Sequence, residues 1–591
     1  MGSEYLLKFR NEYLFNGGIK VDYKEKYEDW LSNDYFDAET KEELKAIAAD
    51  DEEIEERFYK DLDFGTGGMR GIIGAGTNRV NKYTIRKATQ GLANYIEQNG
   101  DKNKGVAISH DNRRKSRKFA TEAALVLAAN GIKAYLFDDL RPTPELSYAV
   151  RELGTTAGIM VTASHNPPEY NGYKVYWEDG AQVVPPHDEG IISEVNEIAS
   201  FDEVKTISKD EAKEDGLFEI IDSALDDKYV KTLKDLSLNK DSIKEVAADL
   251  DIVYTPLHGT GSVMVQRVLE ELGFKNVHVV PEQEEPDEDF STVEYPNPEE
   301  PDVFELGIEL ADEKDAELIM ATDPDSDRVG IAVKDDNDEW TFLDGNQVGI
   351  LLTEYIVNSL EEVPENGTVI KTIVTTEMIN PIAEKYGLDV MNTLTGFKYI
   401  GEKIKEFKEG KYDKEYIFGF EESYGYLYGT HARDKDAIVS TMLIAEMAAH
   451  LKAQGSSIYE ELMRMYEEYG YYKADLEAIR MPGKEGQEKI NAMLADLREN
   501  SPQEINGQEV VVKKDYLVGK SYDLKTGEES ELDLPESNVL QFELKDKTLV
   551  TARPSGTEPK IKFYFSVVGD SEEAAEEKLA EVKSSVMDLV E

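Results

Sequence analysis

The sequence contains no cysteine, so disulfide bonds, thiol catalysis and thiolate metal sites are excluded. It also has no run of about 18 uncharged apolar residues, the length that spans a bilayer. The first residues lack the basic-then-apolar pattern of a secretory signal. We therefore expect a cytoplasmic protein without membrane contact.

Basic residues are outnumbered by acidic ones: 66 Lys and Arg stand against 122 Asp and Glu, a net charge of −56. Such a chain repels nucleic acid and anionic lipid, so neither is an expected partner. The acidic excess itself fits a soluble or salt-adapted surface. A small anionic substrate is still possible, because salt screens charges that lie more than about 8 Å away. Basic residues near the site would then determine whether such a substrate binds.

The length of 591 residues is too great for one hydrophobic core. Strand-like and helical segments alternate, as in the strand at 106–108 and the helix at 116–130, which indicates α/β units with largely parallel sheets. Beyond residue 481 the pattern changes to shorter strands and polar turns. We predict a helical extension at 1–60 followed by four domains at 61–205, 206–335, 336–475 and 476–591.

Ser164 and His165 stand in a proline-stiffened turn, TASHNPP, directly after the apolar run 158–161. An adjacent imidazole is the commonest activator of a serine that attacks or carries a covalent group. A plain turn, whose short polar side chains bond their own backbone, is the other interpretation.

Asp323, Asp325 and Asp327 alternate in a loop after the apolar strand 318–321. Three crowded carboxylates repel one another unless a cation joins them. A calcium EF-hand would need Gly and Glu where this chain has Arg328 and Lys334, so that motif is excluded. Mg²⁺ suits the pattern best, because proteins share it between carboxylates and phosphate oxygens. A solvated acidic loop is the alternative.

Two further segments have the parts of binding loops. Residues 553–559, RPSGTEP, offer an arginine fork, hydroxyl groups and glycine backbone N–H groups to an anion. Residues 419–425, GFEESYG, bring carboxylates that can accept hydrogen bonds from sugar hydroxyls, and a cationic run follows at 431–435. Ordinary turn chemistry and the general acidity of the chain explain each segment equally well when it is taken alone.

Together and in this order, the four motifs resemble those of the α-D-phosphohexomutase superfamily, over nearly the whole chain beyond residue 60. TASHNPPEYNGYK resembles the phosphoserine loop, DPDSDR the metal loop, EES the sugar loop and RPSGTEPKIKFY the phosphate loop. The chain length and the wording GFEESYGY look most like the bacterial phosphoglucomutase branch, which is related to the longer eukaryotic glucose and pentose phosphomutases. The resemblance implies four domains around a central cleft: three similar α/β domains with mostly parallel mixed sheets and a C-terminal α+β domain.

The resemblance also implies a reaction, the interconversion of glucose 1-phosphate and glucose 6-phosphate through a phosphoserine enzyme and glucose 1,6-bisphosphate. One Mg²⁺ per active site would be held by an oxygen of phosphorylated Ser164 and by the three carboxylates Asp323, Asp325 and Asp327. The residues implied to act on the phosphoryl group or its protons are Ser164, His165, Lys174, Arg70 and Arg328.

The resemblance assigns the remaining site residues to substrate binding. The sugar would be read by Thr395, Gly396, Glu421, Ser423 and Lys435. The phosphate that does not react would be gripped by Arg553, Ser555, Gly556 and Thr557.

Other functions stay open. Phe420 and Lys562 depart from the residues that many relatives have at these places, which puts the choice among glucose, mannose and pentose phosphates in doubt. A serine hydrolase would need a G-x-S-x-G elbow, which Ser164 lacks. A non-catalytic sugar-phosphate sensor on the same fold is a further alternative. The expected partners are small sugar phosphates, and both a monomer and a dimer remain possible.

Overall fold

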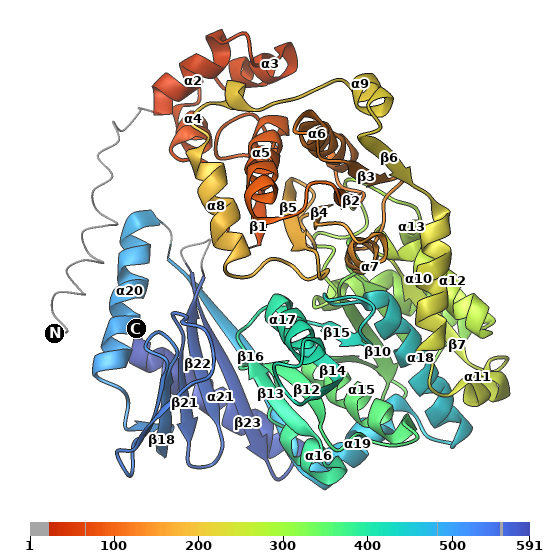
Figure 1. Cartoon of the computed structure of the whole chain (residues 1–591). Coiled ribbons are helices and arrows are strands. Elements are labelled where there is room, and N and C mark those ends of the chain that lie inside the picture. Colours follow the sequence, from red (N-terminus) through yellow and green to blue (C-terminus); the bar gives the residue numbers. More distant parts are fainter. Residues whose placement is uncertain (1–22, 66, 482, 556–559, 591) are drawn as a thin grey trace.

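The structure is a computed structural model that describes residues 23–65, 67–481, 483–555 and 560–590. Three α/β units follow one another along the chain, and a separate antiparallel sheet ends it (Figure 1). This arrangement confirms the predicted fold class. Among the described residues, no helix is both long and apolar enough to cross a membrane.

Among the described residues, three short helices precede the first sheet. Their buried side chains form an aromatic cluster in which Trp30 stacks on Phe36, with ring centroids 4.2 Å apart, and meets Phe58 and Tyr83 edge to face. The cluster fixes the extension on the first unit. The helices are α2 (Tyr23–Ser32), α3 (Ala38–Ala46) and α4 (Asp51–Phe58).

The first unit contains a six-stranded mixed sheet of order β1-β5-β4-β2-β3-β6. Its central strand β4 is apolar along its whole length and fully buried, as expected of a strand covered on both faces. The strands are β1 (Gly68–Ile72), β2 (Val106–His110), β3 (Ala134–Phe137), β4 (Ala157–Val161), β5 (Tyr170–Trp177) and β6 (Phe218–Ile221). The helices are α5 (Lys82–Asn99), α6 (Ser116–Ala129), α7 (Thr143–Leu153), α8 (His187–Glu197), η1 (Phe201–Glu203) and α9 (Lys209–Glu214).

The second unit contains a five-stranded sheet of order β11-β10-β9-β7-β8, in which β9 and β10 form an antiparallel pair. The strands are β7 (Asp251–Thr255), β8 (Asn276–Val279), β9 (Leu318–Thr322), β10 (Val329–Lys334) and β11 (Trp340–Leu343). The helices are α10 (Ser223–Asp235), α11 (Lys240–Val246), α12 (Gly261–Leu272), α13 (Pro281–Glu284), η2 (Pro301–Phe304) and α14 (Glu305–Lys314).

The third unit contains a four-stranded sheet of order β13-β12-β14-β15. Its strands are β12 (Gly367–Thr372), β13 (Asp389–Thr393), β14 (Glu415–Glu421) and β15 (Gly425–Tyr428). Its helices are α15 (Gly345–Ser359), α16 (Ile379–Tyr386), α17 (Phe397–Lys408), α18 (Ala437–Ala453) and α19 (Ile458–Tyr469). Helix α18 packs against α11 and α12, so the second and third units share an interface.

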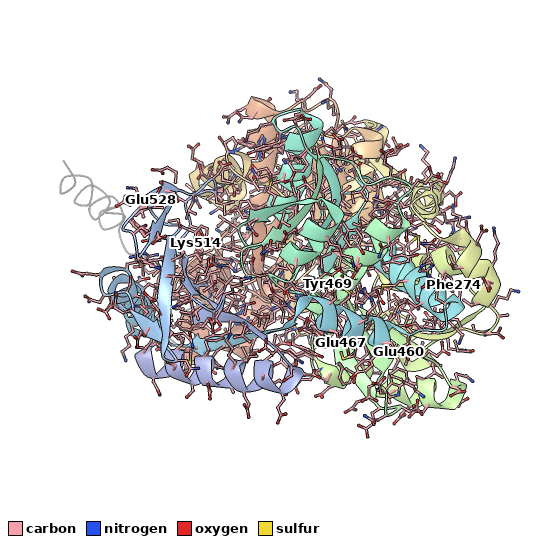
Figure 2. The ribbon with its side chains drawn as sticks, turned by 90° about the horizontal axis from the view of Figure 1, so that it is seen from below. Phe274, Glu460, Glu467, Tyr469, Lys514 and Glu528 are labelled. Carbon is pink, nitrogen blue, oxygen red and sulfur yellow. The ribbon has the colours of Figure 1, made fainter. Side chains whose placement is uncertain are left out.

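The C-terminal domain is an antiparallel sheet with helices α20 and α21 packed against β23. Its strands are β16 (Tyr471–Arg480), β17 (Glu504–Ile505), β18 (Gln508–Asp515), β19 (Lys520–Asp523), β20 (Glu529–Glu531), β21 (Leu540–Leu544), β22 (Leu549–Pro554) and β23 (Lys560–Gly569). Its helices are α20 (Gly483–Glu499) and α21 (Glu572–Val590). Seen from below, Glu460, Glu467 and Tyr469 mark α19, with Phe274 of the second unit to one side and Lys514 and Glu528 of this domain to the other (Figure 2).

Two strands lie across the predicted domain borders. Strand β6 pairs with β3 in the first sheet, although it comes after residue 205. Strand β16 pairs with β23 along its whole length, so the border predicted at 475/476 falls inside a strand of the C-terminal sheet. Both strands join their sheets through pairings with residues distant in the sequence.

Candidate functional site

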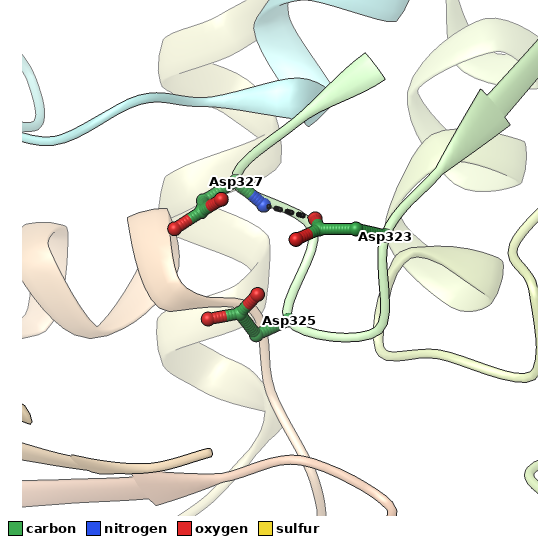
Figure 3. A group of neighbouring side chains, drawn as sticks. All are labelled: Asp323, Asp325 and Asp327. Carbon is green, nitrogen blue, oxygen red and sulfur yellow. Dashed lines mark hydrogen bonds between the residues drawn. The ribbon is translucent and has the colours of Figure 1, made fainter. Parts of the chain in front are cut away.

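The three alternating aspartates lie in the turn between β9 and β10. The backbone N–H of Asp327 donates to Oδ1 of Asp323 at 3.0 Å (Figure 3). The backbone N–H of Arg328 donates to the same oxygen, also at 3.0 Å. The turn also places Ser326 in the left-handed region, at φ 54°. These bonds fold the loop tightly enough for the three carboxylates to converge.

The carboxylates form a buried cluster whose closest oxygens all lie within 4.8 Å of one another. Asp323 and Asp325 are 0% exposed and Asp327 is 1% exposed. Oδ1 of Asp325 and Oδ1 of Asp327 are buried and have no hydrogen-bond partner among the described residues. Buried acceptors without donors are costly, and an all-oxygen donor set is what a hard divalent cation prefers. The residues present therefore fit a Mg²⁺ ion.

Two lysines balance part of this negative charge. Nζ of Lys174, on β5, lies 2.7 Å from Oδ2 of Asp325 and 3.1 Å from Oδ2 of Asp327. Nζ of Lys435 lies 3.2 Å from the same oxygen of Asp327. Burial favours a neutral Asp327, but Lys174 and Lys435 outweigh it and hold the pKa of this carboxyl well below its usual range. Burial and Asp325 raise the pKa of Asp323.

Ser164 follows β4 directly and reaches the aspartate cluster. It is buried, adopts φ 54°, and its backbone N–H donates to Oγ1 of Thr162 at 2.8 Å. Its Oγ donates to Oδ2 of Asp323 at 3.0 Å and lies 3.2 Å from Nδ1 of His165. The hydroxyl from the first unit thus touches a carboxylate from the second.

Basic groups surround His165. Burial, together with the Arg328 and Arg70 guanidinium groups, holds the pKa of His165 well below its ordinary value. The neutral imidazole is therefore the favoured form. Arg70, on β1, donates from Nη1 to Oδ1 of Asn166 at 2.7 Å, and Arg328 pairs with Glu299.

The predicted sugar loop lies beside the aspartate loop. Glu421 ends β14, Ser423 lies in the turn to β15, and the backbone N–H of Val329 donates to the carbonyl of Tyr424 at 3.2 Å. Glu421 is 5% exposed, and burial raises its pKa to about 7, aided by Glu422 and opposed by Lys435. Burial therefore favours a protonated carboxyl at this part of the site.

Thr395 and Gly396 lie in the turn between β13 and α17, with Gly396 at φ 115°. Nζ of Lys435 sits 5.8 Å from the ring centre of the next residue, Phe397. Lys435 therefore connects this turn to the aspartate loop, although the sequence predicts only a role in sugar binding for it.

The described part of the phosphate loop also faces the third unit. Arg553 is near the end of β22 opposite Lys562 of β23, and the backbone N–H of Ser555 donates to the carbonyl of Lys560 at 2.8 Å. Burial and Glu422 raise the pKa of Tyr564, on the same pair of strands, to about 12, while Arg553 opposes them. Gly556 and Thr557 lie outside the described residues.

One residue that contacts the cluster is missed by the sequence interpretation. Thr143, the first residue of α7, donates from Oγ1 to Oδ2 of Asp325 at 2.9 Å, and its backbone N–H donates to the carbonyl of Asp325 at 2.9 Å. The only local signal is proline on both sides, at 142 and 144, which is typical of a helix start and says nothing about a metal loop.

Comparisons with known proteins show which family the chain resembles. Models described as phosphoglucomutase/phosphomannomutase alpha/beta/alpha domains I, II and III match residues 61–202, 227–337 and 344–466. The phosphoglucomutase of Staphylococcus haemolyticus is 38% identical over 518 residues, 88% of this chain and 92% of that protein. That of Staphylococcus saprophyticus is 37% identical over 93% of this chain and 96% of its own length.

Two solved structures share the fold. A putative phosphomannomutase from Thermus thermophilus covers 90% of this chain and 99% of its own, with a TM-score of 0.66 and 23% identity. The open form of parafusin, a phosphoglucomutase from Paramecium, covers 90% and 95%, with a TM-score of 0.67 and 18% identity. The chain belongs to the phosphoglucomutase/phosphomannomutase family, which confirms the resemblance carried by the four motifs.

Proposed function

We propose that this chain interconverts glucose 1-phosphate and glucose 6-phosphate, with Ser164 as the phosphoryl carrier and glucose 1,6-bisphosphate as the intermediate. The observation that carries the proposal is the 3.0 Å hydrogen bond from Oγ of Ser164 to Oδ2 of Asp323, inside a buried three-carboxylate cluster. The names of the relatives in two staphylococci support the choice of glucose phosphates.

The cluster of Asp323, Asp325 and Asp327, completed by an oxygen of phosphorylated Ser164, would hold one Mg²⁺ ion. When bound, the ion draws charge from the phosphoryl group during transfer. Lys174 and Lys435 lie against the same carboxylates, so they supply further positive charge around the reacting phosphate.

Phosphoryl transfer breaks the bond from phosphorus to Oγ of Ser164 and forms one to the O6 atom of glucose 1-phosphate. The O6 hydroxyl loses a proton and Oγ gains one. The neutral imidazole of His165, with Nδ1 3.2 Å from Oγ, is placed to exchange that proton. In the second half of the reaction the other phosphate of the bisphosphate returns to Ser164, and the proton moves in the opposite sense.

The intermediate must turn over between the two transfers, so its far phosphate and its sugar hydroxyls need separate contacts. Glu421 and Ser423, with Thr395 and Gly396, would read the sugar. Arg553, Ser555, Gly556 and Thr557 would grip the far phosphate. The pKa of Tyr564 responds both to Glu422 of the third unit and to Arg553 of the C-terminal domain, which supports a common cleft for these two loops.

The experiment is a turnover assay with glucose, mannose and ribose 1-phosphates, on the wild-type chain and on Ser164→Ala, in the presence of Mg²⁺. We expect the glucose substrate to turn over fastest and the variant to be inactive. Faster turnover of mannose or ribose 1-phosphate would show that glucose 1-phosphate is not the preferred substrate. Near-normal rates with Ser164→Ala would refute the role of Ser164 as the phosphoryl carrier. We propose that the substrates are small sugar phosphates and that the reaction takes place in the cytoplasm.

A further inference from the structure

A buried arginine outside the predicted site contacts the backbone of residues 164–170, the serine loop. Arg113 is in the turn between β2 and α6, and its side chain is fully buried. Its Nη1 donates to the carbonyls of Pro167, at 2.8 Å, and Tyr170, at 3.3 Å. Its Nη2 donates to the carbonyls of Ser164 and Asn166. One guanidinium group therefore holds four backbone carbonyls of the segment 164–170.

The guanidinium is itself fixed from two other sides. Nε lies 3.1 Å from Oδ2 of the buried Asp111, whose other oxygen accepts the backbone N–H of Arg113 at 3.0 Å. The ring of Phe290, from the second unit, lies 4.9 Å from the centre of the guanidinium. Phe290 is fully buried and adopts φ 49°. Arg113 thus ties the first unit's serine loop to the second unit, which also carries the aspartates.

The serine loop needs such a support. Ser164 is held at φ 54°, which is unfavourable for a residue with a side chain and persists only where surrounding contacts impose it. Its Oγ must stay within reach of Asp323 for in-line transfer, since a 1 Å misplacement can cost about 100-fold in rate. The carbonyl of Ser164 is one of the four that Arg113 binds.

We propose that Arg113 is a positioning residue for the phosphoryl carrier: it fixes the backbone of Ser164, and Phe290 of the second unit holds the arginine in place. The proposal rests on the proposed role of Ser164. It requires the planar fork of arginine rather than its charge, because a lysine ammonium is a point charge with three donors and cannot span four carbonyls.

The test compares Arg113→Lys with Arg117→Lys, a matched change one turn further along the chain. Arg117 binds the carbonyl of Phe137 and His110, and no bond joins it to the serine loop among the described residues. Two quantities are measured: kcat and KM for glucose 1-phosphate with Mg²⁺, and hydrogen–deuterium exchange of the segment 164–170 without substrate. The exchange measurement reads the loop directly and does not depend on any reaction.

For Arg113→Lys we expect kcat to fall about 100-fold with KM changed by less than about threefold, and exchange at 164–170 to accelerate about tenfold or more. Arg117→Lys is expected to leave both near wild type. Phe290→Leu, which keeps the arginine but removes its ring contact, is expected to lower kcat about tenfold and to accelerate exchange in the same segment.

Wild-type kcat and unchanged exchange in Arg113→Lys would overturn the proposal, as would equal effects of the two lysine variants. If Arg113→Lys does not fold, Phe290→Leu decides by the same readouts, and unchanged values overturn the proposal. A wild-type chain that turns over no sugar phosphate would refute the proposed function, whereas the exchange result would still show whether Arg113 holds the loop.

Discussion

At the scale of single residues, the site depends on the contact between Ser164 and a carboxylate cluster in which some oxygens lack a hydrogen-bond donor. The hydroxyl donates to Asp323, while one oxygen each of Asp325 and Asp327 is buried without a hydrogen-bond partner among the described residues. A cation satisfies these oxygens at once, so its affinity is the first property that a change in the cluster alters.

Asp325→Asn is therefore expected to weaken cation binding and to lower kcat by at least about 100-fold, because the bound ion contributes several kcal/mol of charge stabilisation. Titration with Mn²⁺, followed by electron paramagnetic resonance, measures the affinity separately from activity. Asp338→Asn is the control, because this side chain is 79% exposed in the turn between β10 and β11. Equal Mn²⁺ affinity in both variants would count against the cluster as the metal site.

Glu421 links pH to stability. Its pKa in the folded protein is about 7, above the ordinary value of 4.5, so the native state favours the protonated carboxyl. Its contribution to stability is fully present below pH 4.5 and is lost as pH rises through 7.

Glu421→Gln, which stays neutral, is expected to match wild type at pH 5 and to be more stable at pH 8, by about 3 kcal/mol at most. Its activity should fall, because an amide nitrogen, which only donates, replaces one of the two carboxyl oxygens that can accept hydrogen bonds from sugar hydroxyls. Unfolding midpoints in urea at the two pH values check this. If the difference in stability between the variant and wild type is the same at pH 5 and at pH 8, Glu421 is not held in the protonated form.

The sequence predicts residues whose chemistry is local and misses those that act across units. Two patterns can be recognised from neighbouring residues alone: Ser164 beside His165, and the alternating aspartates from Asp323 to Asp327. Thr143 lies 182 positions from Asp325 and looks like an ordinary helix start, so only the folded chain reveals its bond. The family resemblance implies a role in sugar binding for Lys435, yet its Nζ also contacts Asp327.

At the scale of elements, backbone contacts join the metal loop to the sugar loop. The N–H of Val329 donates to the carbonyl of Tyr424, and the N–H of Ala437 donates to the carbonyl of Ser326, both at 3.2 Å. Helix α15 begins beneath the same turn: a Cβ added to Gly345 would lie 2.1 Å from the carbonyl oxygen of Glu422. The helix start and the turn therefore fit only without a side chain.

Gly345→Ala is expected to displace the sugar loop and to raise KM for glucose 1-phosphate about tenfold or more, since misplacement by 1 Å costs up to about 100-fold. Steady-state kinetics measure this. Gly307→Ala in α14 is the control, because its added Cβ would meet only side-chain methyl groups, of Ile319 at 3.0 Å and of Val253 at 3.9 Å, and no backbone. Unchanged KM in Gly345→Ala would mean that the turn does not bind the sugar.

The predicted strands agree with the structure to within two residues: the strand at 106–108 corresponds to β2 at Val106–His110, and that at 318–321 to β9 at Leu318–Thr322. Hydrophobic runs and the turns that bound them are local signals. The sheet to which β6 or β16 belongs depends on partners far away in the sequence, so the domain borders could not be drawn from the pattern alone.

At the scale of the whole molecule, the first three units share one hydrophobic core that includes Leu146, Ile252 and Val369. The C-terminal domain has its own core, built around Phe542 and Phe563. It meets the third unit through a smaller cluster that includes Val374 and Tyr564. The separate core indicates that this domain is not needed for the folding of the others.

A chain ending at Gly470 is accordingly expected to fold and to bind Mn²⁺ like the full chain. Its kcat/KM should fall by at least about 100-fold, because the grip on the far phosphate is removed. Circular dichroism, Mn²⁺ titration and turnover assays check the three statements. Full activity of the shortened chain would show that the C-terminal loop does not hold substrate.

The account depends above all on Ser164 carrying the phosphoryl group. The most direct measurement treats the full chain with glucose 1,6-bisphosphate and Mg²⁺, and maps phosphate by peptide mass spectrometry before and after addition of glucose 1-phosphate. We predict one phosphate, on Ser164, which exchanges with added sugar phosphate at the rate of turnover. Full turnover with Ser164 unphosphorylated, or with the exchanging phosphate on another residue, would contradict the account.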